Sequence, residues 1–151
     1  MSGLADDISR GFAQIMADAG VAVFNESGDY DLTDTGIVMK AVPPSPNRLV
    51  TITVVPLTDD IAAPQGQVMV QLRFRGLPGV PLDVDELADT IKPLFHGLSN
   101  TPMGDHVLMQ CDRRQSVPLG QDALKRWERA DQYYLDVEYP PSALVPEGGT
   151  Y

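Results

Sequence analysis

The sequence contains a single cysteine, two histidines and no apolar run long enough to cross a membrane. A membrane-spanning helix needs about 20 consecutive apolar residues, so we expect no membrane association. The N-terminus shows neither the positive start nor the apolar block of a secretory signal. Cys111 has no second cysteine with which to form an intrachain disulfide or a CxxC site. The sequence therefore predicts an intracellular chain that stays reduced.

Motifs of catalytic chemistry are also absent. The sequence has no GxxxxGKS/T phosphate loop, no GxGxxG after a predicted strand and no GxSxG nucleophile turn. His96 and His106 have no histidine four residues away, although Asp105 and Cys111 leave a metal site or a Cys–His pair as an alternative. We expect no catalytic residue, no cofactor and no metal. A small metal-dependent hydrolase that uses the two histidines is the remote alternative.

Positive charge is scarce in this chain. Lys and Arg total 11 against 21 Asp and Glu, which gives a formal net charge of −10. Proteins that bind DNA tightly usually have a basic surface, because neutralising phosphates supplies much of their affinity. We therefore expect no specific DNA binding. A ring through which DNA passes without binding remains compatible with this charge.

Two segments have apolar residues at helical spacing. The first covers residues 4–19. The second begins near Asp83, which is expected to cap it and to form a capping box with Glu86. Pro93 is expected to kink or end this second helix, and Gly97 is the expected terminator.

The other apolar runs are typical of strands. Predicted strands cover residues 21–24, 36–41, 48–55, 67–75, 105–113 and 132–139. Proline-broken loops and antiparallel-type alternation predict an α+β fold. It is a single domain with a mixed, mostly antiparallel sheet and two helices packed on one face. We expect the domain to cover residues 1–140 and residues 141–151 to form a flexible tail.

One segment is unusually basic. Five of the 11 basic residues lie between Arg113 and Arg129, together with the only tryptophan. Arginine, tryptophan and tyrosine are enriched at binding hot spots, so this segment is a candidate contact with another subunit or partner. The alternative is a hairpin connection whose tryptophan covers the core and whose charges are solvated. The candidate contact residues are Arg113, Arg114, Lys125, Arg126, Trp127, Glu128, Arg129 and Tyr133.

The same segment resembles a family of small tailed-phage proteins. Its stretches PLGQD (118–122), RWER (126–129) and DQYY (131–134) resemble the C-terminal signature of minor capsid proteins that look like tail terminators of long-tailed, non-contractile phages. The resemblance extends to residues 4–24, 37–55 and 71–76 and to the following helix. The tail after Pro140 has no counterpart.

The resemblance implies a structural role in the virion. Tail terminators form a ring, typically of six copies, at the head-proximal end of the tail tube, where they stop tube polymerisation and join the head connector. The implied partners are copies of the chain, the tail tube protein and the connector or stopper protein, with DNA passing through the lumen. The implied location is the tail or neck of the virion, assembled in the host cytoplasm. The alternative from the same class is a head-completion or neck connector protein.

We expect the double substitution Arg126→Glu and Arg129→Glu in this basic segment to weaken ring formation and to leave the fold of the monomer intact.

Overall fold

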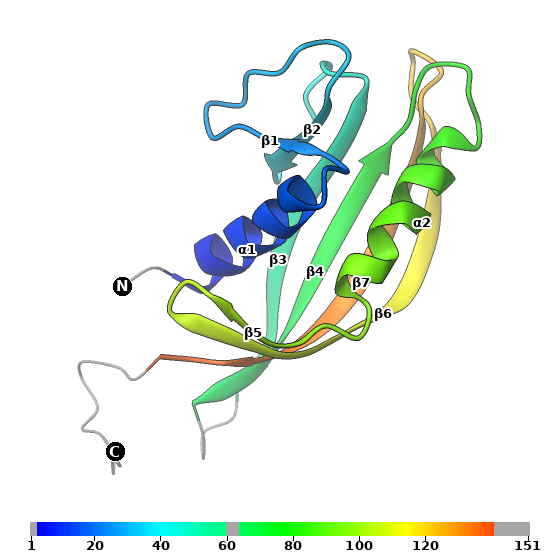
Figure 1. Ribbon diagram of the computed structural model, residues 1–151. Helices are drawn as coiled ribbons and strands as arrows, with labels where there is room; N and C mark the ends of the chain where they lie inside the picture. The colour runs from blue at the N-terminus through cyan, green and yellow to red at the C-terminus, as the bar shows by residue number, and fades with distance from the viewer. Residues whose placement is uncertain (1–2, 60–63, 141–151) are drawn as a thin grey trace.

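The computed structural model describes residues 3–59 and 64–140. They form one seven-stranded sheet with the strand order β1-β2-β3-β4-β7-β6-β5 and two helices (Figure 1). No helix in these described ranges is long and apolar enough to span a bilayer. The elements are α1 (Leu4–Asp18), β1 (Val23–Phe24), β2 (Thr35–Met39), β3 (Arg48–Asp59), β4 (Gln65–Arg75), α2 (Asp83–Phe95), β5 (Ser99–Met103), β6 (His106–Gln121) and β7 (Trp127–Glu138).

The sheet is mixed and curled, and the predicted fold class is confirmed. β1, β2 and β3 pair in parallel, whereas all other neighbouring strands pair antiparallel. β4 shows the predicted alternation, because Val68, Val70, Leu72 and Phe74 are fully buried and the residues between them are partly exposed. This alternation gives the sheet one apolar face and one mostly polar face.

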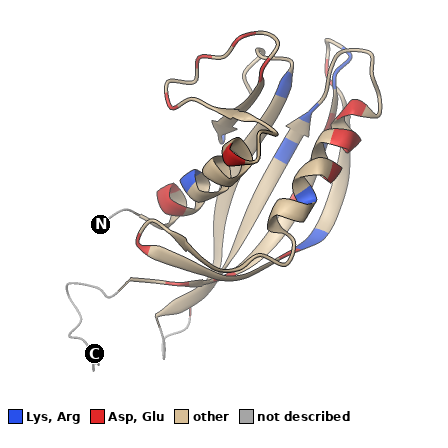
Figure 2. Cartoon of the chain, viewed as in Figure 1, with Lys and Arg blue, Asp and Glu red and all other residues tan. Residues whose placement is uncertain are grey.

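Both helices pack on the apolar face of the sheet (Figure 1). α1 buries Phe12 and Met16, and α2 buries Ile91 and Phe95. These side chains join the strand residues in one continuous core. Because each helix presents its apolar stripe to the sheet, most of its charged residues lie on the outside, and acidic residues lie on both helices (Figure 2). Asp7 of α1 and Asp83 of α2 are the buried exceptions.

Both helices lie where the sequence predicts them, but the predicted N-terminal cap of α2 is wrong. α1 ends at Asp18. α2 ends at Phe95 and is followed by His96 in an extended conformation, and Gly97, with φ of +88°, comes one residue later. α2 continues through Pro93 to Phe95. Asp83 makes no capping hydrogen bond at the N-terminus of α2. Its carboxylate instead binds Arg48, with Nε–Oδ2 at 3.0 Å.

The structure contains more strand than the sequence predicts. β5 was not predicted, because residues 99–103 (SNTPM) show no apolar alternation. β6 continues to Gln121 and β7 begins at Trp127, so the segment expected to be a polar connection is mostly strand. It has no clear alternation because β6 is bulged and largely exposed there. Residues 141–151 lie outside the described residues, so the flexible tail stays a prediction.

Candidate functional site

The predicted contact residues all lie on the β6–β7 hairpin. Arg113 and Arg114 belong to β6, and Lys125 and Arg126 belong to the turn that joins the two strands. Trp127, Glu128, Arg129 and Tyr133 belong to β7. The hairpin therefore brings the predicted residues together in one supersecondary unit, but their side chains have very different surroundings.

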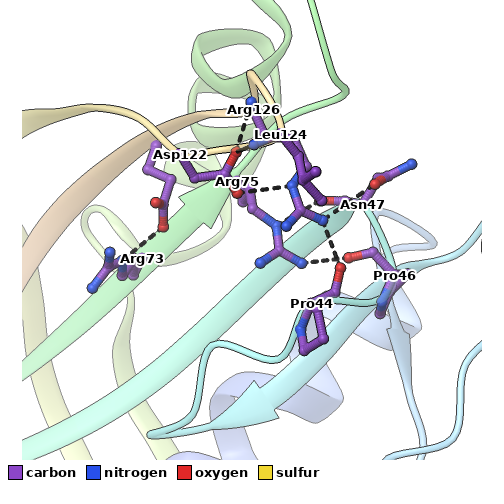
Figure 3. Close-up of polar contacts among 9 residues, drawn as sticks. Pro44, Pro46, Asn47, Arg73, Arg75, Asp122, Leu124 and Arg126 are labelled. Carbon is purple, nitrogen blue, oxygen red and sulfur yellow. Dashed lines mark hydrogen bonds and ion pairs between the residues drawn. The ribbon is translucent and has the colours of Figure 1, made fainter.

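Arg126 is buried and braces the turn (Figure 3). Only 3% of it is exposed. Its Nε donates to Asp122 Oδ2 at 2.9 Å, and its NH1 donates to the Pro44 carbonyl at 2.6 Å and to Asn47 Oδ1 at 3.2 Å. The hairpin turn is thereby fixed to the connection between β2 and β3. The polar contacts of Arg126 are thus made within its own chain, and its side chain is not exposed to a partner.

Arg75 lies beside Arg126 and fixes the same connection (Figure 3). Its NH2 and Nε donate to the carbonyls of Pro46 and Asn47 at 2.5 and 2.9 Å. Burial, and then the charge of Arg126, lower the pKa of the Arg75 guanidinium. Burial acts to raise the pKa of Asp122, but hydrogen bonds from Arg126 and Leu124 outweigh it and lower that pKa. Two neighbouring buried arginines are tolerated because carbonyls and one carboxylate surround them.

A second charged network joins β7 to α2. Arg129 binds Asp131 through Nε at 2.8 Å and binds Asp85 and Asp89 through NH1 at 3.1 and 3.2 Å. Burial disfavours the charge on Arg129, but hydrogen bonds and attraction from Asp131 and Asp85 outweigh it and raise the pKa of the guanidinium. Arg113 contacts the fully buried Asp131 at 3.5 Å. Arg129 therefore joins α2 to β7, and Arg113 joins β6 to the same buried carboxylate on β7.

Tyr133 lies in the core and not on the surface. Its exposed fraction is 0%, and its ring makes edge contacts with Phe12 and Phe95, whose own rings stack at 4.1 Å. Its hydroxyl has no hydrogen-bond partner in the described structure. Burial, and then the negative charge of Asp131, raise the pKa of this hydroxyl. Tyr133 is therefore a core residue and shares the buried face of β7 with Leu135 and Val137.

The remaining predicted residues differ in exposure. Trp127 is partly buried against the core, and Glu128 accepts a hydrogen bond from Arg73 Nε at 3.0 Å. Arg114 and Lys125 are exposed. Arg114 binds Asp112 at 3.0 Å, and its guanidinium carbon lies 4.8 Å from the centre of the Tyr134 ring. Among the predicted residues, Arg114 and Lys125 are the ones most open to a partner.

An exposed apolar surface lies at the end of the same hairpin and was not predicted. We call residues 76–82 and 122–126 the hairpin end. The two segments are joined by a backbone hydrogen bond from Gly79 N to Lys125 O at 2.8 Å, and Gly76 N donates to the carbonyl of Trp127, directly after the second segment, at 3.0 Å. The large apolar side chains exposed there are Leu77 (40%), Val80 (45%), Leu82 (73%) and Leu124 (58%). Their sequence spacing gives no signal, because two segments far apart in the chain contribute them.

The histidines and the cysteine are not gathered into one site. His106 Nδ1 lies 2.7 Å from Asp7 Oδ2, whereas His96 Nδ1 accepts the backbone N–H of Arg113 at 3.0 Å. Cys111 is buried, and burial followed by the charge of Asp112 raises the pKa of its thiol to about 12. Across residues 3–59 and 64–140, no three His, Cys, Asp or Glu side chains are placed to hold a metal ion together.

Comparisons with known proteins identify the family. No curated protein matches this chain. The fold is similar to that of a chain in the solved virion of a native gene transfer agent (GTA) particle, with a TM-score of 0.58 and 12% identity over 89% of this chain and 95% of that chain. The family model described as bacteriophage tail terminator protein matches residues 15–139. This match covers most of the sequence and confirms the resemblance seen in its motifs. The chain belongs to the bacteriophage tail terminator family, and it is a structural, non-enzymatic component of the virion tail.

Proposed function

We propose that this chain forms a closed ring at the head-proximal end of the tail tube, stops tube polymerisation there and joins the tail to the head connector. The family match over residues 15–139 is the observation that carries this proposal. The fold likeness to a chain of a gene transfer agent virion supports it. The copies assemble in the host cytoplasm, and six copies per ring is the number that the family resemblance implies.

The hairpin end suits a permanent contact with another virion protein. Monomeric proteins rarely expose large contiguous apolar patches, and such patches commonly mark interaction sites. Residues 76–82 and the turn between β6 and β7 lie at the same end of the sheet (Figure 1), and the four exposed side chains belong to these two segments. Because Arg126 and Arg75 fix the surrounding connections, this surface is rigid before it docks, which lowers the entropic cost of binding. We propose the tail tube protein as its partner.

The charge of the chain suits a ring that DNA crosses. The formal net charge of −10 repels phosphates and disfavours non-specific binding. A channel protein that held DNA tightly would hinder ejection. The proposed ring therefore lets DNA pass through its lumen without specific contacts, and its protein partners are the neighbouring copies, the tail tube and the head connector.

The proposal predicts that the purified chain caps tails assembled without it. Negative-stain microscopy should show wild-type protein at one end of most tails. Leu82→Asp together with Leu124→Asp should abolish capping, because two carboxylates would be buried against an apolar partner. Leu32→Asp is the matched control, since Leu32 is 69% exposed outside the hairpin end, and it should cap tails like wild type.

Two outcomes would contradict parts of this proposal. If the doubly substituted chain caps tails as well as wild type does, the hairpin end is not the contact. If wild-type protein binds heads and leaves tails uncapped, the chain acts as a head-completion protein instead. Circular dichroism of each variant establishes that the substitutions leave the fold unchanged.

A further inference from the structure

β3 extends beyond the strand that lies beside it. β2 pairs with β3 only from Arg48 to Ile52, whereas β3 continues to Asp59. On the side away from β4, the described chain places no strand against Thr53–Asp59. A strand edge of this kind presents backbone N–H and C=O groups that can pair with another chain. We call residues 53–59 the β3 free edge.

β6 has a second free edge on the opposite side of the sheet. β5 pairs with β6 only as far as Gln110. Gly97 N then donates to the Cys111 carbonyl, and Arg113 N donates to His96. From residue 114 to residue 121, β7 is the only strand in the described ranges that pairs with β6. We call residues 114–121 the β6 free edge.

The two free edges are complementary in direction. β3, β4, β7 and β6 follow one another across the sheet with antiparallel pairing at each step, so β3 and β6 run in opposite directions. We propose that copies of this chain join by antiparallel pairing of the β3 free edge of one copy with the β6 free edge of the next. A contact between two different surfaces closes into a ring when the rotation from one copy to the next divides a full turn evenly. This inference rests on the ring of the proposed function.

The faces of the sheet restrict the register of this pairing to shifts of two residues, and within these we propose Val55 opposite Val117. Paired residues on neighbouring strands project from the same face of the sheet, and Val55 pairs with Met69, which pairs with Tyr134. Val117 pairs with Ala130, which lies an even number of residues from Tyr134 on β7 and so shares its face. Val55 and Val117 therefore project from the same face, the one away from the helices, and both are half-buried. Placing them opposite each other matches the faces of both edges and forms a β-branched cross-strand pair. A slip by one residue would put every side chain on the wrong face.

Prolines and bulges restrict the contact to one short ladder. Pro56 lies on the β3 free edge and Pro118 on the β6 free edge, and each strand has a bulge at its proline. Such features blunt exposed edges against pairing, and because proline has no N–H group, the proposed ladder is limited to a few residues around Val55 and Val117. The free edges also lie at opposite ends of the sheet (Figure 1), so pairing them staggers successive copies. A stagger of this kind is what tilted strands in a closed barrel require.

Disulfide crosslinking in assembled virions tests the pairing. Directly opposed residues in an antiparallel ladder have Cα atoms about 4.5–5.5 Å apart, which suits a disulfide. Virions that contain Val55→Cys with Val117→Cys should give, after oxidation, a ladder of crosslinked chains that ends at the ring. The control is Val55→Cys with Ser116→Cys, because Ser116 projects from the other face and should not crosslink. Cys111 is buried and does not compete.

The outcomes separate this inference from the proposed function. A ring that is visible by electron microscopy but shows no crosslink between positions 55 and 117 overturns the edge pairing and leaves the ring intact. Tails with no ring of this protein overturn the proposed function as well. Homodimers formed by either single-cysteine variant overturn the head-to-tail arrangement, and a crosslink confined to one chain overturns contact between copies.

Discussion

Replacing Arg126 by alanine is expected to lower the free energy of unfolding by about 3–5 kcal/mol, as measured by urea denaturation. Arg126 is 3% exposed, and its guanidinium binds Asp122, Pro44 and Asn47. Its removal takes a donor from the Pro44 carbonyl and from Asn47 Oδ1, and it leaves Asp122 with the backbone N–H groups of Leu124 and residue 126 but without a cation. It also releases the β2–β3 connection from the hairpin turn, so the rigid base of the hairpin end would be lost.

Arg114→Ala is the matched control for this prediction. Arg114 is an exposed arginine of the same hairpin, and its ion pair with Asp112 is solvated. Exposed ion pairs contribute about 0–1 kcal/mol, so this variant should unfold close to wild type. Equal losses in the two variants would show that Arg126 has no bracing role. The paired substitution of Arg126 and Arg129 by glutamate, first expected to spare the fold, should instead unfold the chain, because both side chains hold buried networks together.

Phe12→Ala is expected to lower the free energy of unfolding by about 3–5 kcal/mol. Phe12 is fully buried, stacks on Phe95 at 4.1 Å and contacts Tyr133 by its edge. Truncation leaves a cavity at the point where α1, α2 and β7 meet. Because the surrounding strands are fixed by long ladders, the cavity cannot collapse fully. Urea unfolding monitored by circular dichroism measures the loss.

Tyr133→Phe in the same cluster is the control. The Tyr133 hydroxyl is buried without a hydrogen-bond partner in the described structure, so its removal keeps the aromatic contacts and relieves an unsatisfied polar group. This variant should be as stable as wild type or more stable, by about 1 kcal/mol. A large loss in Tyr133→Phe, or a loss below about 1 kcal/mol in Phe12→Ala, would contradict the packing described for this core.

Periodic patterns in the sequence predicted the elements whose burial repeats regularly. α1 and β4 have apolar residues at helical and alternating spacing, and both lie where the sequence indicated. β5 and the second half of β6 were missed because they are short or exposed and bulged, so neither leaves an apolar repeat. The fold class depends on the regular elements, and for this reason it was predicted correctly.

The candidate site was harder to predict because it depends on contacts between distant residues. Arginine usually lies on the surface, and nothing in the sequence near Arg126 indicates its burial. The carbonyl that it binds belongs to Pro44, which is 82 positions away in the sequence. Tyr133 alternates with polar neighbours in a way that fits either a core or a binding position. The hairpin end combines residues near 80 with residues near 124, and only the hydrogen bonds between the two segments bring them together.

The most direct test of the account is a cryo-electron microscopy reconstruction of the head-proximal end of the tail in virions that contain this chain. We predict a single closed ring of copies between the tail tube and the head connector, with β3 of each copy beside β6 of the next and the hairpin end against the tube. A virion in which this position is occupied by another protein, or in which this chain lies outside the tail axis, would contradict the account.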